Sequence, residues 1–243
     1  MPEDFADGSW IGLFSGGKDS SWAVYRALER GLSVDRLLTV HPEGDSYMYH
    51  VPETRLTALA AESMGIPLVD VEPGDLEAEG VRDSGRQGDD ELEPLEVAVA
   101  TLDDELEGGV TGVTAGAVES EFQTSRIEGM CERLDCDLFA PLWQADPRTL
   151  AESMLEAGFE ILIVQVAAAG LDESWLGRTY DADALADLEA LNEEYGVHLL
   201  GEGGEFETLV IDGPHMGRRL DLEYETEWAG TRGRIRVTEA SLE

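Results

Sequence analysis

A short glycine-rich segment, SGGKDS at residues 15–20, constrains the fold more than any other part of the sequence. It follows an apolar run at residues 10–14 (WIGLF), which has the length and composition of a buried strand. It leads into residues 19–30, where apolar side chains recur with a helical period. Glycines between a strand and a helix form an anion cradle, because backbone amides and the helix N-terminus point at the ligand. The segment therefore predicts a phosphate-binding loop in an α/β fold.

The side chains of this loop suit a phosphate ligand. Its glycines let the backbone approach an anion closely, and its serine hydroxyls can donate hydrogen bonds to it. Lys18, the only lysine in the chain, supplies a positive charge and is expected to be exposed. Asp19 is expected either to hold Mg²⁺ or to cap the helix. A glycine turn with a helix cap and no ligand is the alternative interpretation.

A Walker A motif is excluded at this position. The spacing Gly12-x4-Gly17-Lys18 matches most of that motif, but Asp19 stands where it requires Ser or Thr. The residues after Gly12 also have the character of a strand, which leaves no room for the long Walker loop.

Strands and helices are expected to alternate along the first half of the chain. Further strands are predicted at residues 34–40, 68–71 and 110–118, helices at 52–64 and 94–106, and an acidic glycine-rich loop at 72–90. This alternation predicts a parallel sheet with helices on both faces. Such sheets bind ligands beyond the carboxyl ends of their strands.

The second half of the chain is less regular and predicts a smaller α+β domain. Helices are expected at residues 147–157 and 183–195, a strand at 159–168, and alternating charged and apolar residues at 219–238 are typical of strands. We expect a nucleotide-binding domain at residues 1–137 and a substrate-recognition domain at residues 138–243.

The charge of the chain is extreme. The chain contains 16 Lys and Arg and 53 Asp and Glu, which gives a net charge of −37. This balance argues against nucleic acid as a partner, because binding to phosphates depends on Lys and Arg. The acidic residues are spread along the whole chain, and molar salt would screen their repulsion. We therefore expect a protein from a halophilic archaeon, although an ordinary acidic protein remains the alternative.

The sequence also indicates a cellular location. The first ten residues, MPEDFADGSW, lack the apolar segment of a secretory signal, and no apolar stretch is long enough to span a bilayer. The two cysteines, Cys131 and Cys136, provide no disulfide framework and too few thiols for a structural zinc site. We expect a cytoplasmic protein with no membrane partner, in which Cys131 is part of the core.

Two further segments narrow the function. The loop SGGKDS resembles that of the ATP pyrophosphatases, which have an adenine-nucleotide α-hydrolase-like (HUP) fold and cleave ATP between the α and β phosphates. Residues 115–126 (AGAVESEFQTSR) and 201–208 (GEGGEFET) complete a combination that resembles the diphthine–ammonia ligase family. The resemblance implies amidation of diphthine on translation elongation factor 2: ATP adenylates the carboxylate, ammonia displaces AMP, and pyrophosphate is released.

The resemblance and the chemistry of the residues together give a candidate site. ATP and Mg²⁺ are the expected cofactors, with Asp19 as the candidate metal ligand. The residues expected at the nucleotide are Ser15, Gly16, Gly17, Lys18, Asp19, Ser20, His41 and Gly116. Those expected at the acceptor substrate are Ser120, Gln123, Arg126, Glu205 and Glu207, and Lys18, Asp19, Glu205 and Glu207 are the candidate catalytic residues.

Alternatives remain for parts of this site. Ser120 and Gln123 also fit a helix capping box. Glu205 and Glu207 also fit a solvated acidic loop, and a single histidine such as His41 is often structural. For the whole chain, the competing functions are a tRNA-modifying ATP pyrophosphatase and a non-catalytic nucleotide-binding regulatory module.

Overall fold

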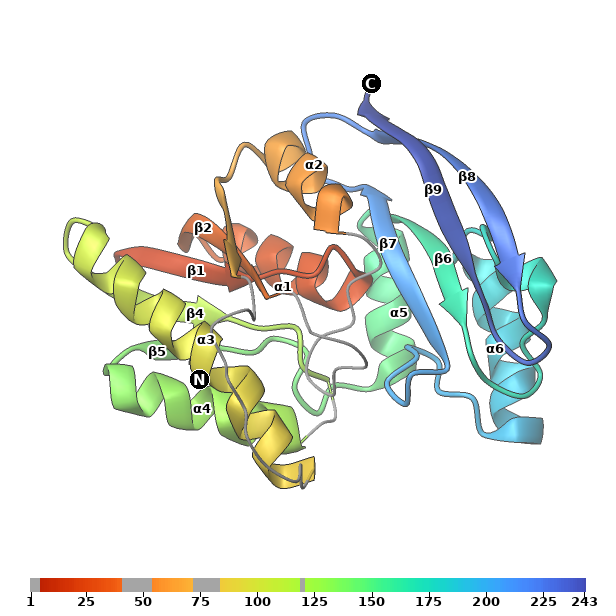
Figure 1. The fold of residues 1–243 in the computed structure, drawn as a ribbon, viewed down its shortest axis with the longest axis horizontal. Helices are drawn as coiled ribbons and strands as arrows, with labels where there is room; N and C mark the ends of the chain where they lie inside the picture. Colours follow the sequence, from red (N-terminus) through yellow and green to blue (C-terminus); the bar gives the residue numbers. More distant parts are fainter. Residues whose placement is uncertain (1–4, 41–53, 72–83, 119–120) are drawn as a thin grey trace.

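The computed structural model describes residues 5–40, 54–71, 84–118 and 121–243. The first part of the chain forms a five-stranded sheet in the order β3-β2-β1-β4-β5, and every neighbouring pair is parallel (Figure 1). The strands are β1 (Ser9–Leu13), β2 (Ser33–Val40), β3 (Leu68–Val71), β4 (Val110–Thr114) and β5 (Asp137–Phe139). The expected parallel sheet is confirmed.

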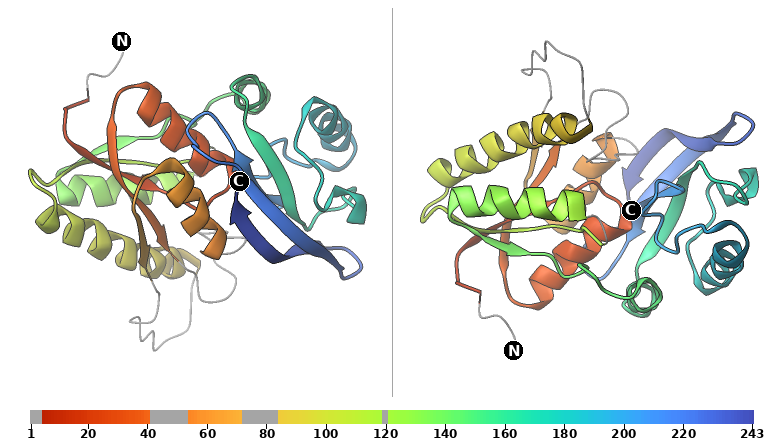
Figure 2. Two further views of the ribbon diagram at one scale, coloured as in Figure 1. Left: turned by 90° about the horizontal axis from the view of Figure 1, so that it is seen from above. Right: turned by 90° about the horizontal axis from the view of Figure 1, so that it is seen from below.

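Helices pack on both faces of this sheet, as the sequence predicted (Figure 2). They are α1 (Lys18–Glu29), α2 (Thr54–Met64), α3 (Ser84–Glu105) and α4 (Glu121–Leu134). Successive strand residues point to opposite faces, so Trp10 packs with α1 and α2 while Ile11 packs with α3 and α4. Cys131 lies in the α3–α4 core, as expected. Among the described helices, none is long and apolar enough to cross a membrane.

Helix α3 is longer than the sequence indicated. Residues 84–90 were expected in a loop and Pro94 was expected near the helix start, but α3 begins at Ser84 and contains Pro94 in its interior. An internal proline removes a hydrogen bond and costs about 3 kcal/mol. The buried Leu92 and Leu95 flank this proline and pack against the core, and this burial offsets the cost.

The second part of the chain forms the expected smaller α+β unit. Its four-stranded antiparallel sheet has the order β7-β6-β9-β8. The strands are β6 (Glu160–Val166), β7 (Phe206–Asp212), β8 (Leu220–Trp228) and β9 (Gly233–Leu242), and the helices are α5 (Pro147–Glu156), the short η1 (Glu173–Trp175) and α6 (Ala182–Tyr195). The alternating residues near the C-terminus form the β8–β9 hairpin.

An aromatic cluster joins the two parts. Trp22 and Tyr25 of α1 contact Phe159, which precedes β6, with ring centroids 5.4 and 5.5 Å apart. His215, in the connection from β7 to β8, stacks on Phe159 at 5.0 Å. Its Nδ1 atom is buried and has no hydrogen-bond partner among the described residues. Burial disfavours the charged imidazolium and lowers the pKa of His215 to about 4.

This histidine makes stability depend on pH. The unfolded chain binds a proton near pH 6.5, whereas the folded protein binds it only near pH 4, so folding is favoured less as the pH falls through this window. His215 should account for about 2 kcal/mol of stability lost between pH 7 and pH 5. His215→Phe should remove that part of the pH dependence in denaturant titrations at the two pH values. Equal slopes in wild type and variant would contradict the assignment.

Candidate functional site

The order of the parallel sheet reverses between its central strands, β1 and β4. Open α/β sheets bind ligands at such a reversal, in the crevice beyond the carboxyl ends of the strands. The glycine-rich loop follows β1 and Gly116 follows β4, so both lie at this edge. The fold therefore brings these two sequence-predicted features together where a ligand is expected.

The loop is held in shape by its own serines. Ser15 Oγ and Ser20 Oγ lie 3.1 Å apart, and Ser20 Oγ also donates to the carbonyl of Gly17 at 3.1 Å. Gly16 has a φ of +81°, a left-handed conformation that glycine adopts without strain. Gly17 is the N-cap of α1 and provides no side-chain cap. No side chain of the N-cap residue therefore competes with an anion for the amides at the start of the helix.

Gly116 packs directly on the start of α1. A Cβ atom here would lie 2.5 Å from the carbonyl carbon of Asp19 and 2.6 Å from the amide nitrogen of Ser20. Backbone atoms cannot yield as a flexible side chain does. Only glycine therefore allows the end of β4 to approach the phosphate loop so closely.

Lys18 is buried, and the expectation of an exposed lysine is wrong. Its side chain is 3% exposed. Its Nζ donates to Asp19 Oδ2 at 2.8 Å and to the carbonyl of Leu200, and it lies 5.7 Å from the centre of the Phe206 ring. Leu200 and Phe206 belong to the C-terminal part, which covers the lysine. Sequence alone does not reveal this cover, because Leu200 lies 182 positions further along the chain.

The two carboxylate oxygens of Asp19 differ in their hydrogen bonding. Oδ2 accepts from Lys18, while Oδ1 is buried without a hydrogen-bond partner among the described residues. The hydroxyl of Tyr180 donates to the carbonyl of Leu199 at 2.9 Å. Burial, and secondarily the negative charge of Asp19, raises the pKa of Tyr180. A buried, unpartnered carboxylate oxygen beside an anion-binding loop suits a cation ligand.

The segment at residues 201–208 is organised by Glu205. Its two carboxylate oxygens accept hydrogen bonds from the amides of His198 at 3.0 Å and Gly203 at 2.8 Å. Glu205 thus anchors a loop, in addition to any role toward a substrate. Glu207 lies two residues further, in β7, where it is partly buried opposite Gln165 of β6.

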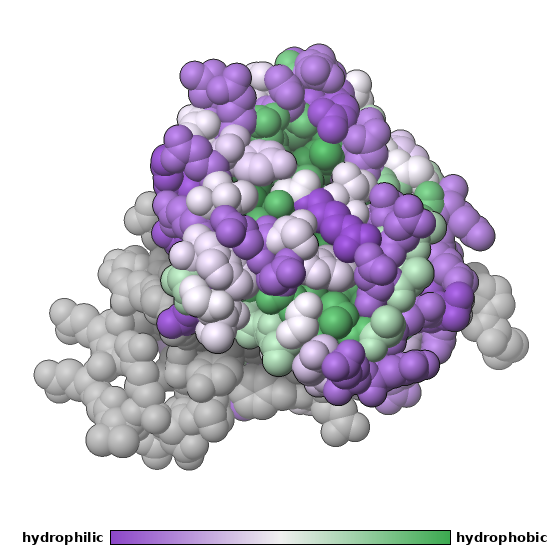
Figure 3. Space-filling view, turned by 90° about the vertical axis from the view of Figure 1, so that its right-hand side faces the viewer, coloured by the Kyte–Doolittle hydropathy of each residue, from purple (hydrophilic) through white to green (hydrophobic). Residues whose placement is uncertain are grey.

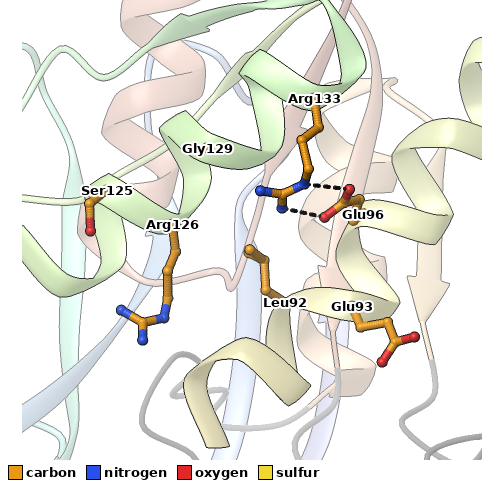
Figure 4. Close-up of a pocket in the computed structure, with 7 residues that line it drawn as sticks. All are labelled: Leu92, Glu93, Glu96, Ser125, Arg126, Gly129 and Arg133. Carbon is orange, nitrogen blue, oxygen red and sulfur yellow. Dashed lines mark hydrogen bonds and ion pairs between the residues drawn. The ribbon is translucent and has the colours of Figure 1, made fainter. Parts of the chain in front are cut away.

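Arg126 lies on α4 and lines a cavity of about 310 Å³ between α3 and α4 (Figure 4). The other lining residues are Leu92, Glu93, Glu96, Ser125, Gly129 and Arg133. Arg133 and Glu96 form a two-bond ion pair there, and the Arg126 guanidinium points away from it (Figure 4). None of these lining residues comes from the phosphate loop.

The remaining predicted residues have less structural support. His41 and Ser120 lie outside the described residues, so their predicted places stay untested. Gln123 is within α4, but its side chain is likewise not described.

The structure adds residues that sequence reasoning missed. Tyr180 and Leu200 lie at the covered loop and belong to no motif, whereas Phe206 and Thr208 belong to a motif but were not expected beside Lys18. The hydroxyls of Thr39, at the carboxyl end of β2, and Thr124, in α4, are buried without a partner among the described residues. Phe206 and Thr208 lie in the GEGGEFET segment, which was the one signal that could have drawn attention to them.

Curated relatives of this chain cover most of its length. The diphthine–ammonia ligase of Danio rerio is 34% identical over 223 residues, which cover 88% of this chain and 86% of the relative. The diphthine–ammonia ligase of Homo sapiens is 33% identical over 229 residues, covering 87% and 81%. A solved structure, titled as a predicted subunit of a tRNA methyltransferase from Methanocaldococcus jannaschii, aligns with a TM-score of 0.39 and 17% identity, covering 78% of this chain and 88% of that one.

Family models match both parts of the chain. The model of the diphthamide synthase N-terminal domain matches residues 8–137, and that of the diphthamide synthase C-terminal domain matches residues 146–242. The first match contains SGGKDS and the 115–126 segment, and the second contains GEGGEFET. The chain belongs to the diphthamide synthase family.

Proposed function

We propose that this protein is an ATP-dependent diphthine–ammonia ligase, which amidates diphthine on translation elongation factor 2 to give diphthamide. The observation that carries the proposal is the match along most of the chain to relatives named diphthine–ammonia ligase. A phosphate loop at the switch point of the sheet supports it, because this chemistry requires ATP to be held there.

The proposed reaction has two steps. A carboxylate oxygen of diphthine attacks the α-phosphorus of ATP, the bond from that phosphorus to the bridging oxygen breaks, and pyrophosphate leaves. Ammonia then attacks the acyl carbon, AMP leaves with the electrons of the C–O bond, and the nitrogen loses a proton. The protein's part is to hold the phosphates, place the carboxylate beside them and exclude water from the adenylate.

The phosphate loop supplies most of the proposed nucleotide contacts. Lys18 neutralises charge that develops on the leaving pyrophosphate, and the amides at the start of α1 bind phosphate oxygens. The full proposed set for ATP is Ser15, Gly16, Gly17, Lys18, Asp19, Ser20, His41 and Gly116. We place this set in a nucleotide-binding domain at residues 1–137.

Asp19 is the proposed protein ligand for Mg²⁺. Mg²⁺ is usually held by one or two carboxylates together with substrate phosphates. The buried, unpartnered Oδ1 of Asp19 fits such a site. Within the described residues no group of three or more His, Cys, Asp or Glu side chains is arranged to hold a metal. When bound, Mg²⁺ would offset charge on the phosphates.

The acceptor is assigned to the other candidate residues. We propose that Ser120, Gln123, Arg126, Glu205 and Glu207 serve diphthine and ammonia, with residues 138–243 as the substrate-recognition domain. The change from a parallel to an antiparallel sheet after β5 supports this division. Carboxylates at residues 205 and 207 suit the trimethylammonium group of diphthine better than a triphosphate. Translation takes place in the cytoplasm, which is the location we propose.

Product analysis tests the function. Purified protein, ATP, Mg²⁺ and ammonium with diphthine-bearing elongation factor 2 should yield AMP, pyrophosphate and a diphthamide-bearing product in equal amounts. Omission of ammonium should stop amide formation. Release of ADP and phosphate would refute the mechanism. Amidation of a tRNA, or nucleotide binding without turnover, would favour one of the two alternative functions.

The acidic surface supports a high-salt environment, and we propose a halophilic archaeal origin. Figure 3 shows a face of the C-terminal part on which hydrophilic side chains predominate around small hydrophobic areas. At a net charge of −37, repulsion should destabilise the fold in dilute buffer. In about 1 M KCl the Debye length falls to about 3 Å and the repulsion is largely screened.

The melting temperature should therefore rise steeply with salt. Circular dichroism melts in a KCl series measure it, and a series in sucrose controls for general stabilisers, which do not screen charge. A melting temperature that is the same in dilute and molar KCl would contradict the proposed adaptation.

A further inference from the structure

Strand β7 lies along the phosphate loop. Strand β7 is an edge strand of the antiparallel sheet. One of its sides pairs with β6, and its other side faces the loop. On the loop side, the amide of Val210 donates to the carbonyl of Gly16 at 2.9 Å, and Thr208 Oγ1 accepts from the amide of Lys18 at 3.2 Å. A strand of the C-terminal part thereby forms one wall of the phosphate loop.

The hydroxyl of Thr208 accepts a hydrogen bond from an amide of the kind that binds anions. The Lys18 amide is the first of α1, and the first amides of a helix have no partner within it and bind anions. In this structure that amide donates to a neutral side-chain oxygen. An arriving phosphate group would compete with Thr208 for the same amide.

The hydroxyl of Thr208 can also donate a hydrogen bond. Thr208 is 4% exposed, so water does not readily serve it. A hydroxyl can donate one hydrogen bond besides those it accepts. Among the described residues, Thr208 Oγ1 accepts from Lys18 and donates to none. A buried hydroxyl beside the phosphate loop that has no acceptor within the described part of the chain is complementary to a phosphate oxygen.

We infer that Thr208 is a phosphate-contacting residue, supplied to the nucleotide site by the C-terminal part. In the nucleotide complex its hydroxyl donates to an oxygen of the diphosphate group held by the loop. The Lys18 amide then donates to that group and no longer to Thr208. The inference rests on the proposed function in taking the ligand to be the pyrophosphate portion of ATP. A neutral hydroxyl is suitable at this position because it can bind phosphate and, unlike a positively charged side chain, it is not attracted to the carboxylate of Asp19.

The test is direct binding, measured by calorimetry with inorganic pyrophosphate and with AMP. Thr208→Val keeps the side-chain shape and removes the hydroxyl, and it should weaken pyrophosphate binding about tenfold or more, as expected for a hydrogen bond to a charged group. Thr208→Ser keeps the hydroxyl and should retain affinity within about threefold. AMP affinity should be the same in all variants, because AMP lacks the diphosphate.

Two further variants keep the test decisive. Thr114→Val removes another buried hydroxyl, which donates to the carbonyl of Ala23 inside the fold, and it should leave pyrophosphate binding unchanged. Thr208→Cys has nearly the original volume and only a weak donor. It should lose most of the affinity, and it replaces Thr208→Val if that variant does not fold.

The outcomes separate the inference from the proposed function. Unchanged pyrophosphate affinity in Thr208→Val, or an equal loss for AMP and pyrophosphate, would overturn the contact and leave Thr208 as a structural residue. A selective loss of pyrophosphate binding would support it, even if product analysis showed that elongation factor 2 is not the substrate. Absence of pyrophosphate binding in the wild type would overturn the inference, whereas the proposed function is tested separately by product analysis.

Discussion

Replacing Lys18 with methionine is expected to abolish ATP cleavage, lowering kcat by about 10³-fold. Methionine keeps an unbranched apolar side chain and removes the charge. The ammonium group lies under the cover of Leu200 and Phe206, and electrostatic stabilisation is strong where water is excluded. The chain contains no second lysine that could replace it. The rate of AMP release with ATP, ammonium and diphthine-bearing elongation factor 2 measures the effect.

Arg26→Met is the matched control, because it removes an exposed cation from the same helix α1. It should leave the rate within about twofold, since exposed ion pairs contribute little. Lys18→Met also leaves Asp19 without its ion-pair partner, so its melting temperature should fall and rates must be compared on folded protein. AMP release by Lys18→Met at more than a tenth of the wild-type rate would contradict the role of the lysine.

The sequence predicted the elements whose signals are local. The apolar run, the glycines and the helical period around residues 15–20 correctly gave β1, the loop and α1 in that order. Alternating elements gave the parallel sheet, and the loss of that alternation gave the smaller C-terminal unit. Each of the elements behind these inferences is identified from residues within about ten positions of one another, where periodicity and turn chemistry are informative.

The sequence did not predict contacts between distant segments. Burial of Lys18 depends on the carbonyl of Leu200, and the amide of the same lysine meets Thr208, 190 positions away. A single sequence carries no signal for such pairs. The start of α3 was missed for a different reason: Pro94 is typical of a helix start, and burial of its neighbours overrides that preference.

These distant contacts link the two proposed halves of the site. The loop that Glu205 anchors begins near His198, and the carbonyl of Leu200 within it accepts a hydrogen bond from Lys18, the lysine proposed to contact ATP. A change in the conformation of this loop should therefore move the Leu200 carbonyl and disturb the position of the Lys18 side chain. The two candidate carboxylates, Glu205 and Glu207, differ in position: Glu205 accepts hydrogen bonds from two amides of this loop, whereas Glu207 lies in β7.

Glu207→Gln should reduce amidation by about 10²-fold and leave ATP binding unchanged, because loss of a charge that faces a cation costs several kcal/mol when water is excluded. Glu207 lies within β7, whereas Glu205 holds the loop whose Leu200 carbonyl accepts from Lys18. Calorimetric titration with ATP and an amidation assay on each variant measure the two effects.

Glu205→Gln is the comparison variant for Glu207→Gln, because Glu205 also holds the loop in place. Glutamine has one acceptor oxygen, so the variant keeps only one of the two backbone-amide hydrogen bonds and turns the NH2 donor of its side-chain amide toward the other backbone N–H. The loop should loosen, and both ATP binding and amidation should fall. Clearly weakened ATP binding in Glu207→Gln would place Glu207 at the nucleotide. The assignment of this carboxylate to diphthine would then be wrong, since a group that serves only the acceptor cannot alter the affinity for ATP in its absence.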